Sequence, residues 1–284
     1  MTVQIGMLCD RIRPDERMVI EAAKRKGVDL KVHNVDELVF TTAKDQEMKF
    51  ESVILQRVMS YFKSLHVTGL LENSGIRVVN SFNAALVCGN KLLTSTALSK
   101  AGVPTPKTVV AFTDESAIKA LDKVGYPAIL KPVVGSWGRL IAPLKDIDST
   151  KAILETREYM FPLYQVFYIQ EMIQNLIRDI RCFVIGDRAV AAIYRYSAPG
   201  EWRTNVARGG RAEVCPITPE LEELCVKAVK AVGGGAFGVD MMETSNGLVV
   251  HEVNYTTEFK ATTESTGVDI PGLMLDYLID MVKH

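Results

Sequence analysis

The first ninety residues alternate short apolar segments with helical segments, a pattern typical of a parallel sheet covered by helices. Residues 3–9 form an apolar run suited to a strand buried on both faces. Pro14 stands at the start of a predicted helix that ends at Gly27. The strand signal then returns three times, at residues 30–35, 53–55 and 76–79. We therefore expect an α/β domain with a small parallel sheet at the N-terminus.

A second region begins near Asn90, and its strands and helices follow one another in mixed order. Residues 103–106 contain two prolines and form a stiff connection after a helix predicted at 92–101. Apolar segments predict strands at residues 107–111, 128–131, 140–142, 167–171, 180–185, 189–196, 237–242 and 248–254. Further helices are predicted to open at Thr113 and to span residues 149–159, 219–232 and 271–282. The whole chain is expected to be α/β (α+β), with more than one domain in its 284 residues.

The charge balance argues against a general nucleic-acid coat, although it is compatible with a local basic groove: 33 Lys and Arg face 34 Asp and Glu, leaving a formal charge of -1. No apolar run reaches the ~18 residues that span a bilayer, and the first residues lack a signal-peptide profile. The five cysteines are scattered without CxxC spacing, which suits small apolar fillers in a reducing compartment. We expect a soluble, cytoplasmic protein with neither nucleic acid nor membrane as partner.

A lysine followed by a glycine loop is the first candidate site. Lys131 ends an apolar strand, and the loop at residues 132–139 contains Gly135, Ser136 and Arg139. Glycines let backbone N–H groups approach phosphate oxygens, while lysine supplies a point charge and arginine a planar fork. The pattern is suited to binding polyphosphate, although GxxxxGK[ST] is absent. A turn with a solvated lysine is the alternative interpretation.

Two carboxylates and an amide form the second candidate site. Glu252 and Asn254 are two apart in a predicted strand and therefore project from one face. If this strand pairs with residues 237–242 across the turn at 245–247, Asp240 joins them. Carboxylates ~4 Å apart would repel by roughly 4 kcal/mol at an effective dielectric near 20. Oxygen ligands suit Mg²⁺, so the set predicts a magnesium site, with a solvent-facing amphipathic hairpin as the alternative.

Arginines concentrate in the third quarter of the chain, at positions 178, 181, 195, 203 and 208. Their planar forks match carboxylate and phosphate oxygens, although surface salt bridges explain many such residues. Gly233–Gly238 fits GxGxxG but follows a helix and enters a strand, the reverse of the dinucleotide-binding order. The histidines have no metal-ligand spacing, and no GxSxG elbow is present. The recurrence of these arginines beside the two candidate sites favours phosphate chemistry.

Together these motifs resemble the ATP-grasp superfamily, specifically its RimK-like carboxylate–amine ligases and the lysine-biosynthesis enzymes of the LysX family, with their ArgX sisters. The similarity runs nearly end to end and includes residues 9–17, 88–91, 131–139, 178–181, 252–254, 258–260 and 266–272. It implies an ATP-grasp fold with a pre-ATP-grasp domain at 1–89, a central lid domain at 90–170 and a C-terminal domain at 171–284.

The resemblance also implies an activity. Such enzymes use ATP and Mg²⁺ to join the amino group of α-aminoadipate to the C-terminal glutamate side chain of LysW, a small acidic carrier protein. The reaction passes through an acyl-phosphate, and ArgX does the same with glutamate. We also expect a homo-oligomer, and Arg203, Arg208 and Arg211 are candidates for steering an acidic carrier.

Roles for individual residues follow from the resemblance alone. Lys91 and Lys131 would contact ATP phosphates, and Arg195, Asn205 and Lys131 would act on the transferring group. The lid loop would comprise Gly135, Ser136, Trp137, Gly138 and Arg139. Adenine would be read by Gln170, Glu171, Met172 and Ile173, and the nucleotide would be fixed by Asp179 and Arg181. Mg²⁺ would be held by Asp240, Glu252 and Asn254. The amino-acid substrate would lie beside Glu258, Phe259, Lys260, Ala261 and Thr262.

The amino-acid specificity rests on Ala261-Thr262. At this place aminoadipate enzymes carry Asn and a small residue, whereas glutamate enzymes carry Gly-Phe. Thr262 and residues 264–272 fit LysX better, while residues 201–203 resemble ArgX. We expect α-aminoadipate, with glutamate or both amino acids as alternatives, because one methylene is worth only about 1–3 kcal/mol. A RimK-like ligase for a ribosomal protein and a nucleotide-binding regulator without turnover are further alternatives.

Overall fold

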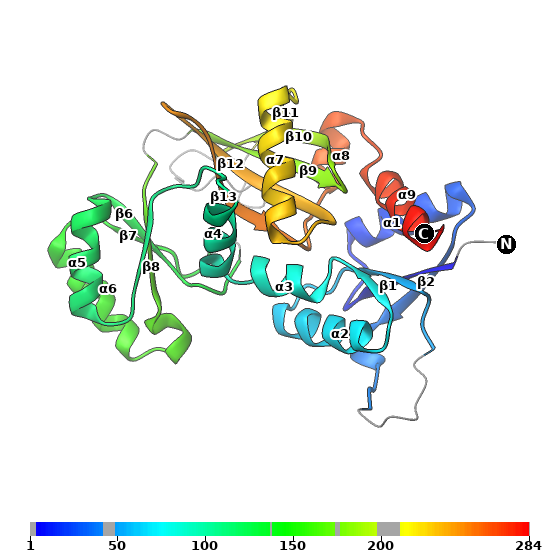
Figure 1. Cartoon of the computed structure of the whole chain (residues 1–284), viewed down its shortest axis with the longest axis horizontal. Coiled ribbons are helices and arrows are strands. Elements are labelled where there is room, and N and C mark those ends of the chain that lie inside the picture. The colour runs from blue at the N-terminus through cyan, green and yellow to red at the C-terminus, as the bar shows by residue number, and fades with distance from the viewer. Residues whose placement is uncertain (1–3, 42–48, 137, 174–176, 198–210, 284) are drawn as a thin grey trace.

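A computed structural model describes residues 4–41, 49–136, 138–173, 177–197 and 211–283. Three β-sheets organise the molecule, and Figure 1 shows them side by side along its longest axis. The N-terminal sheet lies at one end, the sheet formed within residues 108–171 lies at the other, and the sheet formed within residues 178–254 lies between them. Within the described ranges, no helix is both long and apolar enough to cross a membrane.

The N-terminal sheet has the parallel order β2-β1-β3-β4, as the alternating sequence pattern predicted. Its strands are β1 (Gln4–Cys9), β2 (Asp29–Asn34), β3 (Val53–Gln56) and β4 (Arg77–Val79), with α1 (Pro14–Lys26), η1 (Val35–Glu37) and α2 (Tyr61–Asn73) between them. Helix α1 begins at Pro14 and ends before Gly27, whose φ of 65° favours glycine. Apolar side chains of α1 cover one face of the sheet, and those of α2 cover the other.

The second sheet in chain order is antiparallel, with the strand order β5-β8-β6-β7. It comprises β5 (Thr108–Ala111), β6 (Ala128–Lys131), β7 (Ala142–Leu144) and β8 (Phe167–Glu171), together with α5 (Asp114–Val124), α6 (Ile147–Glu158) and η2 (Pro162–Gln165). These elements bury a core of their own that includes Leu121, Leu144 and Leu154. The strand expected at 140–142 is wrong by two residues, because Leu140 has a φ of 57°, outside the β region.

The third sheet has the antiparallel order β11-β10-β9-β12-β13. It comprises β9 (Arg178–Ile185), β10 (Arg188–Tyr196), β11 (Arg211–Val214), β12 (Ala236–Thr244) and β13 (Gly247–Asn254). The associated helices are α3 (Phe82–Cys88), α4 (Lys91–Lys100), α7 (Pro219–Val232), α8 (Lys260–Thr266) and α9 (Ile270–Lys283). The β12–β13 hairpin confirms the predicted pairing across residues 245–247, whereas β11 and α8 were not expected from the sequence.

Two helices pack away from their neighbours in sequence. Leu98 of α4 is buried in the core beneath α7, so α4 belongs to the third sheet although the second sheet follows it in the chain. At the C-terminus, α9 packs beside α1, and its Leu275 and Leu278 share a core with the N-terminal sheet (Figure 1). The first and last parts of the chain are thereby joined. The domain limits at residues 90 and 170 stay a prediction.

Candidate functional site

A cavity of about 730 Å³ opens where the three sheets meet. Residues from β6, β8, β9, β10, β12 and β13 line it, together with the loop after β3 and the loop after β13. The predicted site residues on its wall are Lys91, Lys131, Gly135, Ser136, Gly138, Arg139, Gln170, Glu171, Met172, Ile173, Asp179, Arg181, Arg195, Asp240, Glu252, Asn254 and Glu258. Predicted residues separated by up to 167 positions in the chain (91 to 258) therefore contribute to a single pocket.

Strand alternation explains why polar residues of the third sheet reach this cavity. In β9, Ile180 and Cys182 pack beneath α7. Asp179 and Arg181, which alternate with them along the strand, lie on the opposite face. Arg195 of β10 and Asp240 of β12 follow the same rule on the neighbouring strands. One face of the sheet thus forms a hydrophobic core, and the other forms the charged floor of the cavity.

Lys131 of β6 and Lys91 of α4 supply positive charge to the cavity. The buried Lys131 Nζ donates to Gln170 Oε1 over 2.6 Å. Burial, assisted by the charge of Lys91, lowers the pKa of Lys131 to about 8. Lys91 Nζ donates to Glu252 Oε1 and to the carbonyl of Gly135, both over 2.9 Å. Lys91 therefore ties the glycine loop to the third sheet.

Two bidentate ion pairs form the floor. Arg181 donates to both oxygens of Asp240 over 2.7 Å, and Arg195 donates to both oxygens of Asp179 over 2.7 and 2.6 Å. Arg195 Nη2 also lies 3.2 Å from Asp240 Oδ2. Burial alone would raise the pKa of Asp240, but Arg181 and Arg195 hold it well below its usual range. Asp240 is therefore a charged, buried carboxylate.

The predicted oxygen-donor set converges at this floor. Glu252 lies directly opposite Asp240 in the β12–β13 pairing, and Asn254 Nδ2 lies 3.3 Å from Asp240 Oδ2. Although burial opposes ionisation, Lys91 lowers the pKa of Glu252. Two ionised carboxylates and an amide oxygen are donors that suit a hard cation such as Mg²⁺. The residues present therefore fit such an ion.

A β-bulge adds a residue that the sequence analysis missed. The partners of Asp240 and Met241 are Glu252 and Val250, so His251 is an extra residue in β13. It lines the cavity, and its Nε2 lies 4.0 Å from Asp179 Oδ2 without a hydrogen bond to any described residue. Burial, with the nearby Lys131, lowers its pKa. Only the register of the hairpin reveals this position, because histidine spacing carries no sign of a bulge.

The part of the cavity wall next to the N-terminal sheet is formed by Met59, Tyr61 and residues 256–258. The sequence analysis missed Met59 and Tyr61, although the loop after β3 leaves the carboxyl edge of a parallel sheet, where ligand sites gather. Phe259 is fully buried in the core beneath α1 and α9 rather than on the cavity wall. Lys260, Ala261 and Thr262 belong to α8 and are also outside the lining. Their place beside a substrate stays a prediction.

Four of the predicted residues lie outside the described part of the chain. These are Trp137, Arg203, Asn205 and Arg208. Arg211 is described: it is the first residue of β11, its guanidinium pairs with Glu213, and it stacks over Tyr196 at 4.5 Å. The roles expected for the four residues stay predictions.

Comparisons with known proteins identify the family. A model of the LysX preATP-grasp domain matches residues 5–87, and a model of the RimK-like ATP-grasp domain matches residues 88–278. The chain is 34% identical to a glutamate–LysW ligase (ArgX) of Sulfurisphaera tokodaii, over 97% of this chain and 98% of that one. It is 33% identical to an α-aminoadipate–LysW ligase (LysX) of the same organism, over 98% and 99%.

The fold agrees with this assignment. A crystal structure of a RimK-domain ATP-grasp protein from Sphaerobacter thermophilus superposes with a TM-score of 0.81 at 24% identity, covering 97% of this chain and 99% of that one. The two family models together reach from residue 5 to residue 278, and the sequence relatives extend along nearly the whole chain. The protein therefore belongs to the RimK-like ATP-grasp family and is a ligase that forms a carbon–nitrogen bond.

Proposed function

We propose that this ligase joins the amino group of α-aminoadipate to the C-terminal glutamate side chain of a LysW-type carrier protein, in lysine biosynthesis. The supporting observation is the convergence of two lysines, two acid–arginine pairs and an oxygen-donor set on one cavity. Both sequence relatives named above are LysW ligases. Their identities of 34% and 33% favour neither amino acid, so glutamate is the second candidate substrate.

The cavity offers a place for each part of ATP. Lys91 and Lys131 would contact its phosphates, residues 135–139 would cover them, and residues 170–173 would read adenine. Asp240, Glu252 and Asn254 would hold Mg²⁺, since carboxylate oxygens retain acceptor sites beyond those that the arginines and Lys91 use. When bound, Mg²⁺ neutralises charge on the transferring phosphoryl group.

The chemistry follows from the weakness of a carboxylate as an acyl donor. An oxygen of the carrier's carboxylate would attack the γ-phosphorus of ATP, and the bond to ADP would break. The amine nitrogen would then attack the acyl carbon, and inorganic phosphate would leave. Lys131 and Arg195 would stabilise the phosphoryl oxygens, with Asn205 as a further donor. A closed lid would keep water from hydrolysing the acyl-phosphate.

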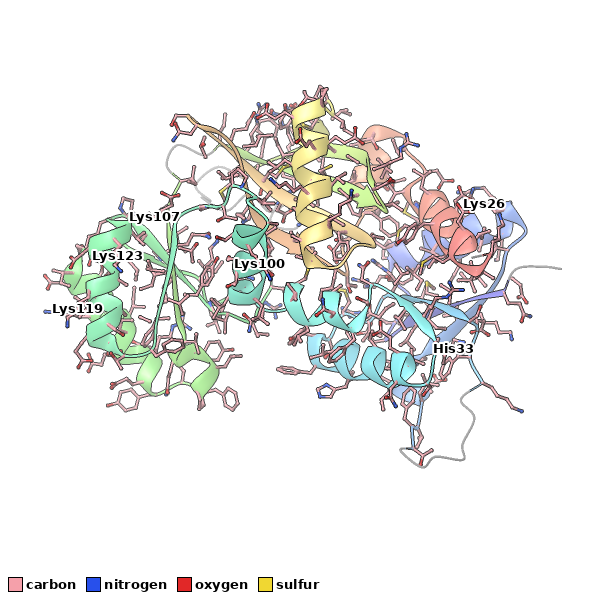
Figure 2. The ribbon with its side chains drawn as sticks, viewed as in Figure 1. Lys26, His33, Lys100, Lys107, Lys119 and Lys123 are labelled. Carbon is pink, nitrogen blue, oxygen red and sulfur yellow. The ribbon has the colours of Figure 1, made fainter. Side chains whose placement is uncertain are left out.

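An acidic carrier would be steered by positive charge near the cavity entrance. Of the basic side chains labelled in Figure 2, Lys26 lies on α1 and Lys100 on α4, while Lys119 and Lys123 both lie on α5. We assign the carrier contact to Arg203, Arg208 and Arg211. At low salt, Arg211→Glu should raise the KM for the carrier, and an unchanged KM would remove Arg211 from the contact.

The reaction is tested by intact mass spectrometry of the carrier after incubation with ATP, Mg²⁺ and either amino acid. The carrier should gain the mass of one amino-acid residue as ADP is released. A carrier lacking its terminal glutamate should gain nothing. Absence of a mass change with both amino acids would overturn the proposal, and modification of a ribosomal-protein tail instead would favour the RimK-like alternative.

The amino acid is decided by the ratio of kcat/KM for α-aminoadipate and glutamate. One methylene is worth about 1–3 kcal/mol, so we expect a preference of about 10- to 200-fold for α-aminoadipate. A ratio in favour of glutamate would place the enzyme with ArgX. Equal values would indicate dual specificity.

A further inference from the structure

The ion pair between Arg13 and Glu258 borders the cavity on the side of the N-terminal sheet. Arg13 Nη1 lies 3.3 Å from Glu258 Oε1 and 2.6 Å from Met59 Sδ. Glu258 and Met59 line the cavity, and Arg13, outside that lining, contacts both of them. The Glu258 side chain is 47% exposed and that of Arg13 is 11% exposed. A ligand in the cavity could therefore reach the pair from one side.

The guanidinium of Arg13 is held in place from behind. Its Nε and Nη2 donate to the two oxygens of Glu16 over 2.9 and 2.6 Å. Glu16 is fully buried and also accepts a hydrogen bond from Arg57 Nε over 2.9 Å. These bonds are shorter than the 3.3 Å contact to Glu258. Arg13 thus keeps its orientation if Glu258 exchanges its partner.

The turn that carries Glu258 is fixed independently of Arg13. Arg57 Nη1 donates to the carbonyl of Thr257 over 2.8 Å. Asp15 Oδ1 accepts the backbone N–H groups of Phe259 and Lys260 over 2.5 and 3.0 Å. The backbone on both sides of Glu258 is therefore anchored to the N-terminal domain. The Arg13–Glu258 pair is not needed to hold the turn, which leaves it available for a ligand.

We propose that this pair receives the α-amino-carboxylate group of the amino-acid substrate, with the carboxylate on Arg13 and the amine on Glu258. A guanidinium matches a carboxylate in shape and charge, and Glu258 offers an acceptor for the amine N–H groups. Binding of the zwitterion replaces the long Arg13–Glu258 ion pair by two new ones, Arg13 with the carboxylate and Glu258 with the amine. Each of the four charged groups therefore keeps a partner.

The spacing selects the α-carboxylate rather than the distal one. In an α-amino acid the ammonium and carboxylate groups are attached to the same carbon, so both can reach two side chains whose charged atoms lie 3.3 Å apart. The distal carboxylate of α-aminoadipate is separated from the amine by further methylenes and would require another cation. The inference rests on the proposed function and names the residues that recognise its second substrate.

The test is a cycle between enzyme variant and substrate analogue. We measure kcat/KM at saturating ATP and carrier for α-aminoadipate and for 5-aminopentanoate, which lacks the α-carboxylate. The wild type should prefer α-aminoadipate by about 100-fold or more, since the analogue leaves a charged hydrogen-bond donor unpaired. In Arg13→Gln this preference should fall to a few-fold. An equal loss for both substrates would overturn the proposal, because it would mean that Arg13 acts only on the fold.

Two controls make the cycle specific. Preference for α-aminoadipate over 2-aminohexanoate, which lacks only the distal charge, should be the same in Arg13→Gln and the wild type. Arg11→Gln, which removes an exposed arginine two residues away, should change neither ratio.

Trapping of the acyl-phosphate by hydroxylamine should persist in Arg13→Gln. If that variant does not fold, Arg13→Lys is measured instead, and an unchanged preference there contradicts the assignment.

Failure of this inference differs from failure of the proposed function. If the wild type attaches neither amino acid to the carrier, the proposed function is wrong. If it attaches one but the cycle shows no coupling to Arg13, only the present assignment is wrong. Glu258→Gln supplies an independent reading, because it should raise the KM for the amino acid without changing the KM for ATP. A change in both would also count against the assignment.

Discussion

Lys131, which we propose contacts the ATP phosphates, has a pKa that the fold lowers strongly. Burial and Lys91 lower its pKa from 10.5 to about 8, so the charged form in the free enzyme is disfavoured. Because an unfolded chain keeps this lysine charged up to about pH 10.5, folding releases a proton between pH 8 and 10.5. The contribution of Lys131 to the free energy of unfolding therefore becomes more favourable as pH rises through this window.

ATP should reverse this shift, since phosphate oxygens favour the ammonium form. We predict that the Kd for ATP rises between pH 7 and pH 9 in the wild type, because binding must then take up a proton. Lys131→Arg should show a flatter profile, as arginine stays charged. Calorimetric titrations in buffers of different ionisation enthalpy measure the proton directly. Equal proton uptake in both proteins would contradict the assignment to Lys131.

Asp240 and Glu243 offer a matched pair on one strand, because each accepts two hydrogen bonds from an arginine of β9. Asp240→Asn leaves the buried Arg181 and Arg195 short of a counter-ion. It should lower the free energy of unfolding by about 3–5 kcal/mol and abolish Mg²⁺-dependent turnover. Glu243→Gln, in a partly exposed pair, should cost about 1 kcal/mol or less. Urea unfolding of both variants provides the comparison, and equal costs would be inconsistent with a buried charge network.

At the level of elements, the sequence predicted the helices and strands that are marked by a local residue pattern, such as a proline at the start or a glycine after the end. Helix α1 is framed by Pro14 and Gly27, and the β12–β13 hairpin by its turn at residues 245–247. Strand β11 and helix α8 escaped prediction, because each is short and takes its shape from packing against other elements. The bulge at His251 is likewise a property of strand register, which a single strand does not encode.

Helix α4 carries Lys91 and is anchored to the third sheet through Leu98, which is 1% exposed. Leu98→Ala should reduce the free energy of unfolding by about 2–5 kcal/mol, through lost burial and the resulting cavity. Leu93→Ala, at a position 39% exposed on the same helix, should cost much less. The measurement is the midpoint of chemical denaturation. A similar midpoint for both variants would mean that α4 does not share that core.

At the level of the whole molecule, the hydrophobic cores define which parts of the protein are destabilised together when one core side chain is truncated. Phe183 and Ile185 of β9 share a core with α1 and α9, which links the N-terminal domain to the third sheet. The core of the second sheet, β5 to β8, is separate and includes Leu154. We predict that Leu154→Ala increases hydrogen exchange mainly within residues 107–171, whereas Leu275→Ala increases it in both other sheets. Uniform increases in both variants would contradict this division.

The composition of the site was predictable in residue types but not in its pairings. Lys131, Asp240 and Glu252 were identified from strand alternation and from the chemistry of their side chains, and the structure brings them to one cavity. The bonds from Arg181 to Asp240 and from Arg13 to Glu16 and Glu258 depend on contacts between distant segments. Such contacts are set by tertiary packing, for which spacing along the chain gives no signal.

The proposed reaction depends on activation of a carboxylate by phosphoryl transfer within this cavity. The most direct measurement uses a carrier whose terminal glutamate carboxylate is labelled with ¹⁸O, followed by mass analysis of the phosphate released in a single turnover. Attack of the carboxylate on the γ-phosphorus predicts one ¹⁸O atom in that phosphate. Unlabelled phosphate, released together with an amino-acylated carrier, would contradict an acyl-phosphate intermediate and activation of the carboxylate by phosphoryl transfer.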